Sequence, residues 1–307
     1  MGLLNRIRRN AVIASGDFGQ IFSDFNLPPC PEVVLTLTKA VRNPDISIDQ
    51  VVAILETDPA LTSIILKTVN SALYRLQGNI SSVSRAVSIL GLREVENTAL
   101  GYAMRQAVSD PGLDRFDFNT FWTDSLLRAL FARNAASVLE VEADEAFAAG
   151  LLQDMALPVL LTQWLDVYGP VYQEWSSSGI PIHLVEQKRL SWSHCQAAAW
   201  IASNWGLPDL MVCCVGLHSA SLEDISSMGL EGTAVTAVVL SSLITHAFRE
   251  VRYAVYLVER SDKLGIPPDR LMEIAEVAGE QVEHLAASLD INTCARPDLV
   301  QILREVR

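Results

Sequence analysis

The sequence predicts an all-α protein that folds as an irregular multi-helix bundle. Apolar residues recur at helical spacing along most of its 307 residues, and capping and stop residues separate these stretches. No segment shows the sustained polar–apolar alternation of a half-buried strand. No repeat appears at the period of about 33–47 residues that is typical of helical solenoids. We therefore expect helices packed around a common core by ridges into grooves.

The first half of the chain carries the clearest helix boundaries. Helices are predicted over 31–42 and 93–108, and three more lie between them. Each boundary has a physical cause: a side chain that accepts from the first backbone N–H groups, a proline in the first turn, or a residue that ends the helix. These boundary residues are Asn43-Pro44, Ser47 with Gln50, Asp58 with Pro59, Ser82, and Gly91. The break at 110–112 (Asp-Pro-Gly) predicts a subdomain boundary.

The second half is predicted to be equally helical. Apolar stripes indicate helices over 119–140, 144–165, 194–205, 208–217, 230–248, 268–289 and 297–305. Glycine, proline and serine clusters are predicted to separate them, at 169–170, 176–179, 206–208 and 265–268. The basic N-terminus around Arg6, Arg8 and Arg9 is predicted to be a frayed leader helix, the alternative being an amphipathic arm that touches a partner or a membrane.

Composition limits the classes of partner and compartment. The formal net charge of −13 disfavours a phosphate backbone, so we expect no nucleic-acid partner. Five cysteines without a C-x-x-C pair are typical of a reducing cytoplasm. No apolar run approaches the ~20 residues of a membrane span, and we expect no transmembrane segment.

The residues that could carry chemistry are one aspartate and three separated histidines. Asp154 follows Gln153 inside an apolar run, where a buried polar group must find a partner. His194, His218 and His246 lie in later helices and could converge with Asp154 on a divalent metal inside a bundle. The alternative, which the absence of a paired H-x-x-x-H spacing favours, is that each histidine is a hydrogen-bonded core residue.

Four motifs in order over residues 27–108 resemble the first half of the HDOD domain, the HD-related output domain of bacterial signalling proteins. They are the stretches at 27–31 (LPPCP), 57–62 (TDPALT), 69–74 (VNSALY) and 80–91 (ISSVSRAVSILG). The resemblance continues to about residue 250 and implies an all-α, HD-domain-like fold. It divides the chain into a leader over 1–19, the HDOD domain over 20–250 with halves at 20–110 and 111–250, and a C-terminal helical extension over 251–307.

The resemblance also points to the positions at which catalytic HD enzymes bind metal. It implies that these positions are vestigial here, at Asp124, Gln153, Asp154, His194 and His218. Glutamine stands where those enzymes have the histidine of the His-Asp pair, and an amide is a poor substitute for an imidazole. Ser219, Phe248 and Pro158 stand where a second histidine, a late aspartate and a lysine are expected.

We therefore expect no catalytic residues, no cofactor and no metal, and a non-catalytic regulatory role in signal transduction through an unidentified protein partner. The resemblance associates that role with cyclic-dinucleotide or two-component signalling. The alternative is a metal-dependent phosphohydrolase that acts on a nucleotide or cyclic dinucleotide through a weak site at Asp154, His194 and His218. A third hypothesis, a nucleotide receptor without hydrolysis, has no phosphate-binding loop to support it.

Overall fold

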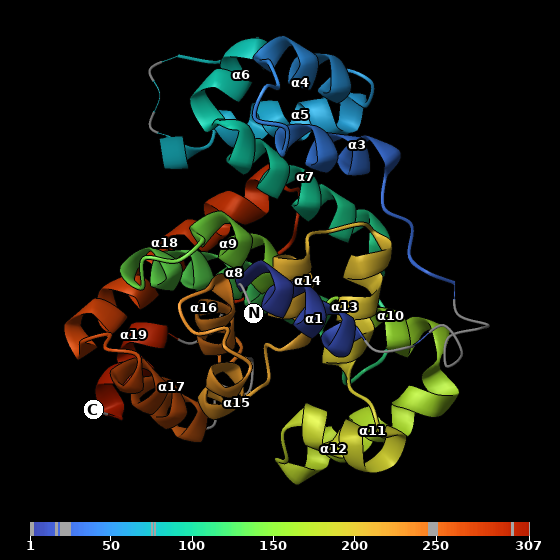
Figure 1. Cartoon of the computed structure of the whole chain (residues 1–307), viewed down its shortest axis with the longest axis vertical. Helices are drawn as coiled ribbons and strands as arrows, with labels where there is room; N and C mark the ends of the chain where they lie inside the picture. The colour runs from blue at the N-terminus through green and yellow to red at the C-terminus, as the bar shows by residue number, and fades with distance from the viewer. Residues whose placement is uncertain are drawn as a thin grey trace.

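The computed structural model describes residues 3–15, 18, 26–74, 76, 78–244, 251–295 and 298–306. Every regular element in this part of the chain is a helix, and none of these residues lies in a strand. The prediction of an all-α, irregular bundle is therefore confirmed (Figure 1).

The first layer consists of five helices that lie together at the top of Figure 1. They are α3 (Glu32–Val41), α4 (Ile48–Leu55), α5 (Pro59–Val69), α6 (Val83–Leu90) and α7 (Leu92–Ala107). A short 3-10 helix, η1 (Ala72–Tyr74), follows α5. The predicted boundaries are confirmed: Ser47 and Gln50 form the capping box, Asp58 accepts from two N–H groups of α5, and Gly91 ends α6 at φ 79°.

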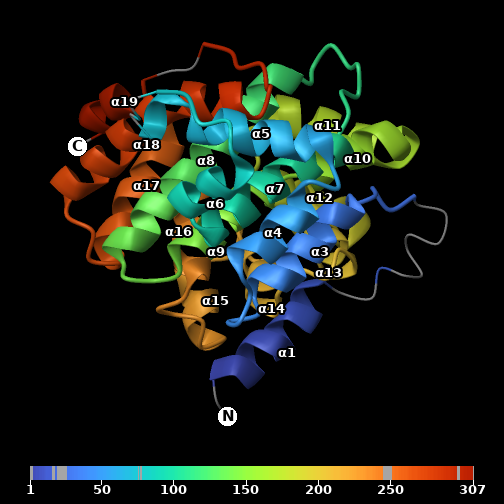
Figure 2. The ribbon, with the colours of Figure 1, turned by 90° about the horizontal axis from the view of Figure 1, so that it is seen from above.

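This layer meets the rest of the bundle where α7 packs on α9 (Ala143–Leu152), which packs in turn on α8 (Phe118–Val138); both lie behind the layer in Figure 2. Gly150 lets α9 approach α8 closely, since a Cβ there would lie 3.0 Å from both the Arg128 carbonyl oxygen and the Ala129 Cα. A third helix, α16 (Ala234–Ser241), is buried against both. This close packing fixes the end of α9 against the middle of α8.

The prediction of a single helix over 144–165 is wrong. A turn at 153–155 separates α9 from α10 (Ala156–Gln163), and the N–H of Met155 bonds back to the carbonyl of Leu152 at 3.1 Å. The apolar pattern runs through the turn because both flanking helices are buried, so periodicity could not reveal it. The turn places Gln153 and Asp154 between two helices rather than along one.

Two further helices, α11 (Leu165–Ser178) and α12 (Ile182–Leu190), were not predicted. The break predicted at 169–170 is wrong, because Pro170 lies inside α11. One proline removes one helical hydrogen bond, and burial of Tyr168, Val171 and Tyr172 on one face of α11 compensates for it. The predicted breaks at 176–179 and 206–208 are confirmed, with Gly179 at φ 64° and Gly206 at φ 68°. The break at 206–208 separates α13 (His194–Asn204) from α14 (Asp209–Gly216).

The N-terminal segment is not frayed over its described residues. Helix α1 (Leu3–Ser15) packs on α13 and α14, with Ile7 and Ala11 buried. The Asn10 side-chain amide also donates to the Met228 carbonyl at 3.3 Å. An apolar face with a defined partner therefore orders this segment.

The chain closes with α15 (Leu222–Ser227), α17 (Val251–Lys263), α18 (Pro268–Ser288) and α19 (Leu299–Glu305). Helix α18 packs along α8, so the C-terminal segment is part of the bundle. The helix predicted over 230–248 is represented by the shorter α16, and 245–250 lie outside the described residues. By length and composition one described stretch, Ala143–Gln163, could cross a membrane, but 78% of its most apolar 18 residues are buried, and it forms the core helices α9 and α10.

A buried cluster of histidine, cysteine and aspartate

The structure brings Asp154, His194 and His218 together. Asp154 lies in the turn after α9, His194 begins α13, and His218 follows the end of α14. The Nε2 atoms of the two histidines are 3.2 Å apart. Oδ1 of Asp154 lies 3.1 Å from Nε2 of His194 and 3.3 Å from Nε2 of His218. Three residues from distant parts of the sequence thus direct polar atoms at one point.

Both histidines are oriented through their Nδ1 atoms. Nδ1 of His194 lies 2.7 Å from Oε2 of Glu186, and Nδ1 of His218 lies 2.7 Å from the Val215 carbonyl oxygen. Since a carboxylate and a carbonyl accept hydrogen bonds, each Nδ1 carries the proton in the neutral ring. The lone pair of each neutral imidazole is then on Nε2, which faces the other ring and Asp154.

Glu186 is itself held in place. It is fully buried on α12, and the Tyr168 hydroxyl of α11 donates to its second oxygen, Oε1. Burial and the neighbouring Glu186 carboxylate raise the pKa of Tyr168 well above its ordinary value, so the phenol keeps its proton. A chain of hydrogen bonds therefore runs from α11 through α12 to the imidazole at the start of α13.

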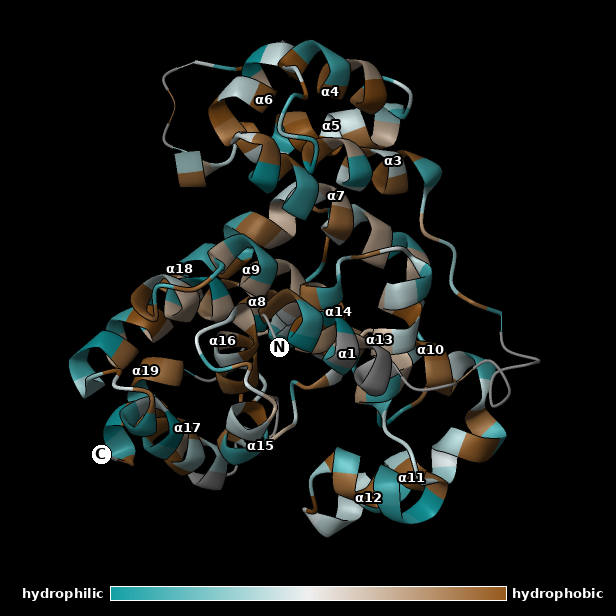
Figure 3. Cartoon of the chain, viewed as in Figure 1, coloured by the Kyte–Doolittle hydropathy of each residue, from teal (hydrophilic) through white to brown (hydrophobic). Residues whose placement is uncertain are grey.

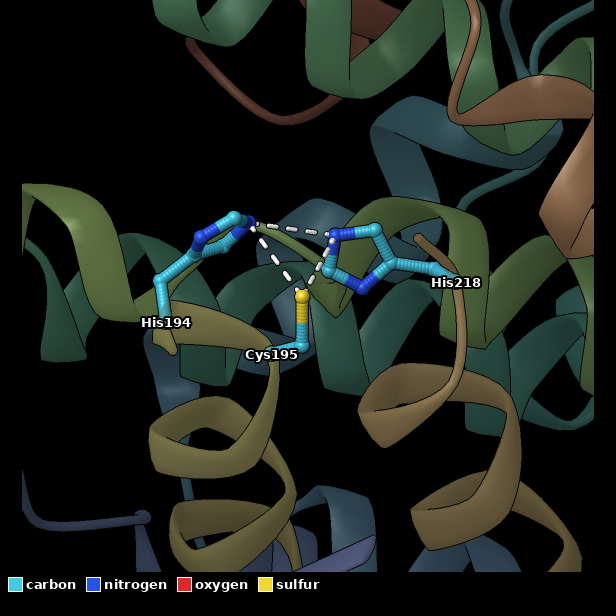
Figure 4. Close-up of side chains that lie close together, drawn as sticks. All are labelled: His194, Cys195 and His218. Atoms are coloured by element: carbon cyan, nitrogen blue, oxygen red, sulfur yellow. Dashed lines mark hydrogen bonds between the residues drawn. The ribbon is translucent and has the colours of Figure 1, made fainter. Parts of the chain in front are cut away.

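Cys195 completes the group, as Figure 4 shows with both histidines. Its Sγ lies 3.7 Å from Nε2 of His194, 3.6 Å from Nε2 of His218, and 3.4 Å from Oγ of Ser219. Burial opposes ionisation of the thiol, but the two imidazoles outweigh it and hold the pKa of Cys195 well below its ordinary value. In the opposite direction, Cys195 and Asp154 raise the pKa of His218 to about 9 despite burial.

Arg128 on α8 binds the other side of Asp154. Its side chain is only 5% exposed, its Nε donates to the Ile244 carbonyl at 2.6 Å, and its guanidinium donates to Oδ2 of Asp154. Asp124, one helical turn earlier, lies 3.9 Å from the same guanidinium. Although burial favours the neutral acid, Arg128 and the histidines hold the pKa of Asp154 well below its ordinary value. One oxygen of Asp154 is thus paired with a cation and the other faces the histidines.

The remaining predicted positions differ in their surroundings. Gln153 is fully buried, and neither atom of its side-chain amide has a hydrogen-bond partner among the described residues. Ser219 contacts Cys195, and Pro158 lies in the first turn of α10. His246 and Phe248 lie outside the described residues.

Sequence reasoning missed four members of the site: Cys195, Arg128, Glu186 and Tyr168. Two of them had a local signal, a cysteine beside His194 and an arginine within the apolar stripe of 126–131. Glu186 and Tyr168 lie on helices that the sequence did not predict.

The cluster contains the residue types that bind transition-metal cations. The ligand atoms of His194, Cys195 and His218 all lie within 4.8 Å of one another, and Oδ1 of Asp154 faces both imidazoles. All three of those residues are buried. A phosphodiester substrate would therefore need a path through packed side chains to reach them.

Comparison with known proteins agrees with the family that the sequence motifs resemble. A family profile for the HDOD domain matches residues 27–221. A curated relative from Treponema pallidum (strain Nichols), named only as an uncharacterized protein, is 23% identical over 195 residues. That match covers 63% of this chain, which spans 37% of the length of the relative.

Several solved structures are similar in fold. A protein from Shewanella amazonensis named putative phosphohydrolase matches at TM-score 0.68 and 19% identity, covering 92% of this chain and 97% of its own. A putative signal transduction protein from Marinobacter aquaeolei matches at 0.67 and 21%, covering 94% of this chain and 66% of its own. An HDOD domain protein of unknown function from Geobacter sulfurreducens matches at TM-score 0.65 and 21% identity, and the match covers 94% of this chain and 99% of that protein. At these identities the likeness establishes an HD-domain-like all-α fold.

Proposed function

Because the chain belongs to the HDOD domain family, we propose that it is a non-catalytic signal-transduction module that acts through protein–protein interaction in the cytoplasm. We further propose that it acts in cyclic-dinucleotide or two-component signalling, with which the resemblance associates this role. The similar solved structure from Marinobacter aquaeolei is named a putative signal transduction protein, which supports a signalling role in general.

The observation that carries the proposal is the pairing of Arg128 with Asp154. A hydrolytic HD centre needs the aspartate and its histidine neighbours for metal ions and activated water. Here a buried guanidinium binds one oxygen of Asp154, and Gln153 stands at the position of a histidine ligand. The carboxylate is thereby committed to a structural ion pair, and the donor set is too small for a two-metal centre.

The surface of α11 and α12 supports a role in binding a protein. Four of the nine exposed large apolar side chains among the described residues lie on this pair of helices and its connecting loop. They are Leu165, Val167, Ile180 and Leu184. The pair projects at the lower edge of Figure 1, and Figure 3 shows apolar segments in both helices. A hollow lined in part by Leu161, Leu165, Pro170 and Tyr172 lies beside them. Exposed apolar patches mark protein interaction sites.

A quantitative capture experiment tests the interaction. The tagged protein, its Leu184→Asp variant and a Tyr256→Asp control are used as baits, since Tyr256 is equally exposed but lies on α17. We expect a defined signalling protein bound by the wild type and the control, with recovery at least about tenfold lower for Leu184→Asp. Equal recovery with all three baits, or no bound protein, would contradict the proposal.

The second candidate is a metal-dependent phosphohydrolase, which the convergence of Asp154, His194 and His218 favours. Metal content does not separate the two functions, because a buried structural ion would also be retained. Turnover separates them. Hydrolysis of a cyclic dinucleotide by the metal-loaded protein that is lost in Asp154→Ala and His194→Ala would support the enzyme.

A further inference from the structure

We infer that helix α1 docks on an anionic lipid surface, which it contacts through Leu3, Leu4 and its arginine side chains. The proposed protein interface on α11 and α12 does not include this helix. The inference therefore goes beyond the proposed function and does not rest on it.

The first observation is the distribution of charge along the chain. Residues 3–15 contain three arginines, Arg6, Arg8 and Arg9, and no aspartate or glutamate, although the whole chain carries a formal charge of −13. Among the described residues, no carboxylate forms an ion pair with Arg6 or Arg8. The positive charge of α1 is therefore available to a negatively charged surface outside the protein.

The second observation is a pair of exposed leucines in the first turn of α1. Leu4 is 82% exposed, more than any other large apolar side chain among the described residues, and Leu3 is 42% exposed. One helical turn after Leu4 lies Arg8, which is also exposed. Apolar side chains next to arginines on a short helix are typical of helices that lie at the surface of an anionic membrane.

The opposite side of α1 is held by the protein. Ile7 and Ala11 are buried against α13 and α14, and the side-chain amide of Asn10 donates to the Met228 carbonyl at 3.3 Å. The helix is thus already formed and oriented before it meets a membrane. It loses little conformational entropy on binding, in contrast to a segment that must fold on the lipid.

The position of α1 lets a flat surface reach it. Figure 2 shows α1 at one edge of the molecule, with its first turn extending beyond α14 and α15. A membrane that approaches from this side meets Leu3 and Leu4 before the acidic surface of the bundle. At physiological salt, charges farther than a Debye length of about 8 Å are largely screened, so the acidic bundle opposes this contact only weakly.

A lipid surface fits this narrow strip better than a second protein does. A stable protein interface buries about 800 Å² on each partner. A helix of 13 residues with one side buried offers less than about half of that area. Membrane contact needs no such area, because each arginine near an anionic surface strengthens binding by about fivefold and an inserted leucine by about tenfold.

Sedimentation with lipid vesicles tests the inference. The purified full-length protein is mixed at low salt with vesicles of phosphatidylcholine that contain about 30% phosphatidylglycerol, or with vesicles of phosphatidylcholine alone. We expect reversible binding to the anionic vesicles that is half-maximal near about 1 mM accessible lipid. Binding to phosphatidylcholine should be at least about tenfold weaker, and about 0.5 M salt should release the protein, because screening removes the attraction of the arginines.

Two variants of the exposed face identify the contact. Arg8→Ser should weaken binding by about fivefold and Leu4→Ser by about tenfold. Both side chains are exposed, so the urea midpoint of each variant should equal that of the wild type. Leu184→Ser on α12 and Arg270→Ser on α18 remove exposed side chains of the same types elsewhere and should bind vesicles like the wild type.

No sedimentation with the anionic vesicles, or equal binding to both kinds of vesicle, would overturn the inference. So would a loss in the Leu184→Ser control as large as that in Leu4→Ser. Capture of an acidic protein through α1 without any vesicle binding would make this face a protein interface and overturn the lipid assignment. Vesicle binding that persists when no signalling partner is captured would leave this inference intact and count only against the proposed function.

Discussion

Replacing Arg128 by methionine should destabilise the metal-free protein by about 4 kcal/mol. Removing one partner of a buried ion pair costs about 3–5 kcal/mol, because the other charge is left uncompensated. Since 13% of the Asp154 side chain is exposed, the lower end of about 3 kcal/mol applies. The Ile244 carbonyl loses the hydrogen bond from Arg128 Nε as well, which adds about 1 kcal/mol.

Urea unfolding followed by tryptophan fluorescence measures this loss. With a slope of about 3 kcal/mol per molar urea, the midpoint should fall by roughly 1 M. Arg270→Met is the matched control, because its ion pair with Glu273 is exposed and should contribute under about 1 kcal/mol. The double variant Arg128→Met/Asp154→Asn should be more stable than additivity predicts by about 2 kcal/mol. A loss no larger than that of the control, or strict additivity, would refute the view that Arg128 neutralises Asp154.

Two further predictions concern packing and thiol chemistry. Gly150→Ala should destabilise the protein by about 1–3 kcal/mol in the same urea assay, because the new Cβ meets the backbone of α8. The new Cβ in Gly101→Ala meets side-chain methyl groups of Leu289 and Leu151 instead of backbone and should cost less, so equal losses would argue against the tight α8–α9 contact. Burial raises the pKa of Cys30 from 9.0 to about 12, so its reactive thiolate forms only near that pH. At about pH 8, alkylation of Cys30 by iodoacetamide should be about 1,000-fold slower in the folded protein than in urea, and comparable rates by peptide mass spectrometry would contradict this.

The fold was largely predictable because its boundaries are local. A capping serine, an Asp-Pro start or a glycine with positive φ acts within one helical turn, and such signals located α3 to α7. Prediction failed at the turn at 153–155 and at α11, where burial of flanking residues decides the conformation. Periodicity does not separate one buried helix from two, and Pro170 indicated a break that packing overrides.

The site was predictable only in part. Asp154, His194 and His218 were identified, and the structure shows that they meet. Their partners Arg128 and Glu186 come from distant segments, and only the tertiary arrangement brings these charges to the histidines. A lone charged residue in an apolar helix indicates burial, but the sequence does not say which opposite charge it meets.

Phosphodiester turnover tests the central claim, that this HD-like site does not catalyse hydrolysis. The wild type and Asp154→Asn are loaded in turn with zinc, manganese and ferrous iron, and incubated with a cyclic dinucleotide and with a chromogenic phosphodiester. We predict that both proteins give the rate of the protein-free control with every metal, because Arg128 pairs with Asp154 and Gln153 stands at the position of a histidine ligand. A rate that rises with metal occupancy in the wild type and is lost in Asp154→Asn would contradict the claim.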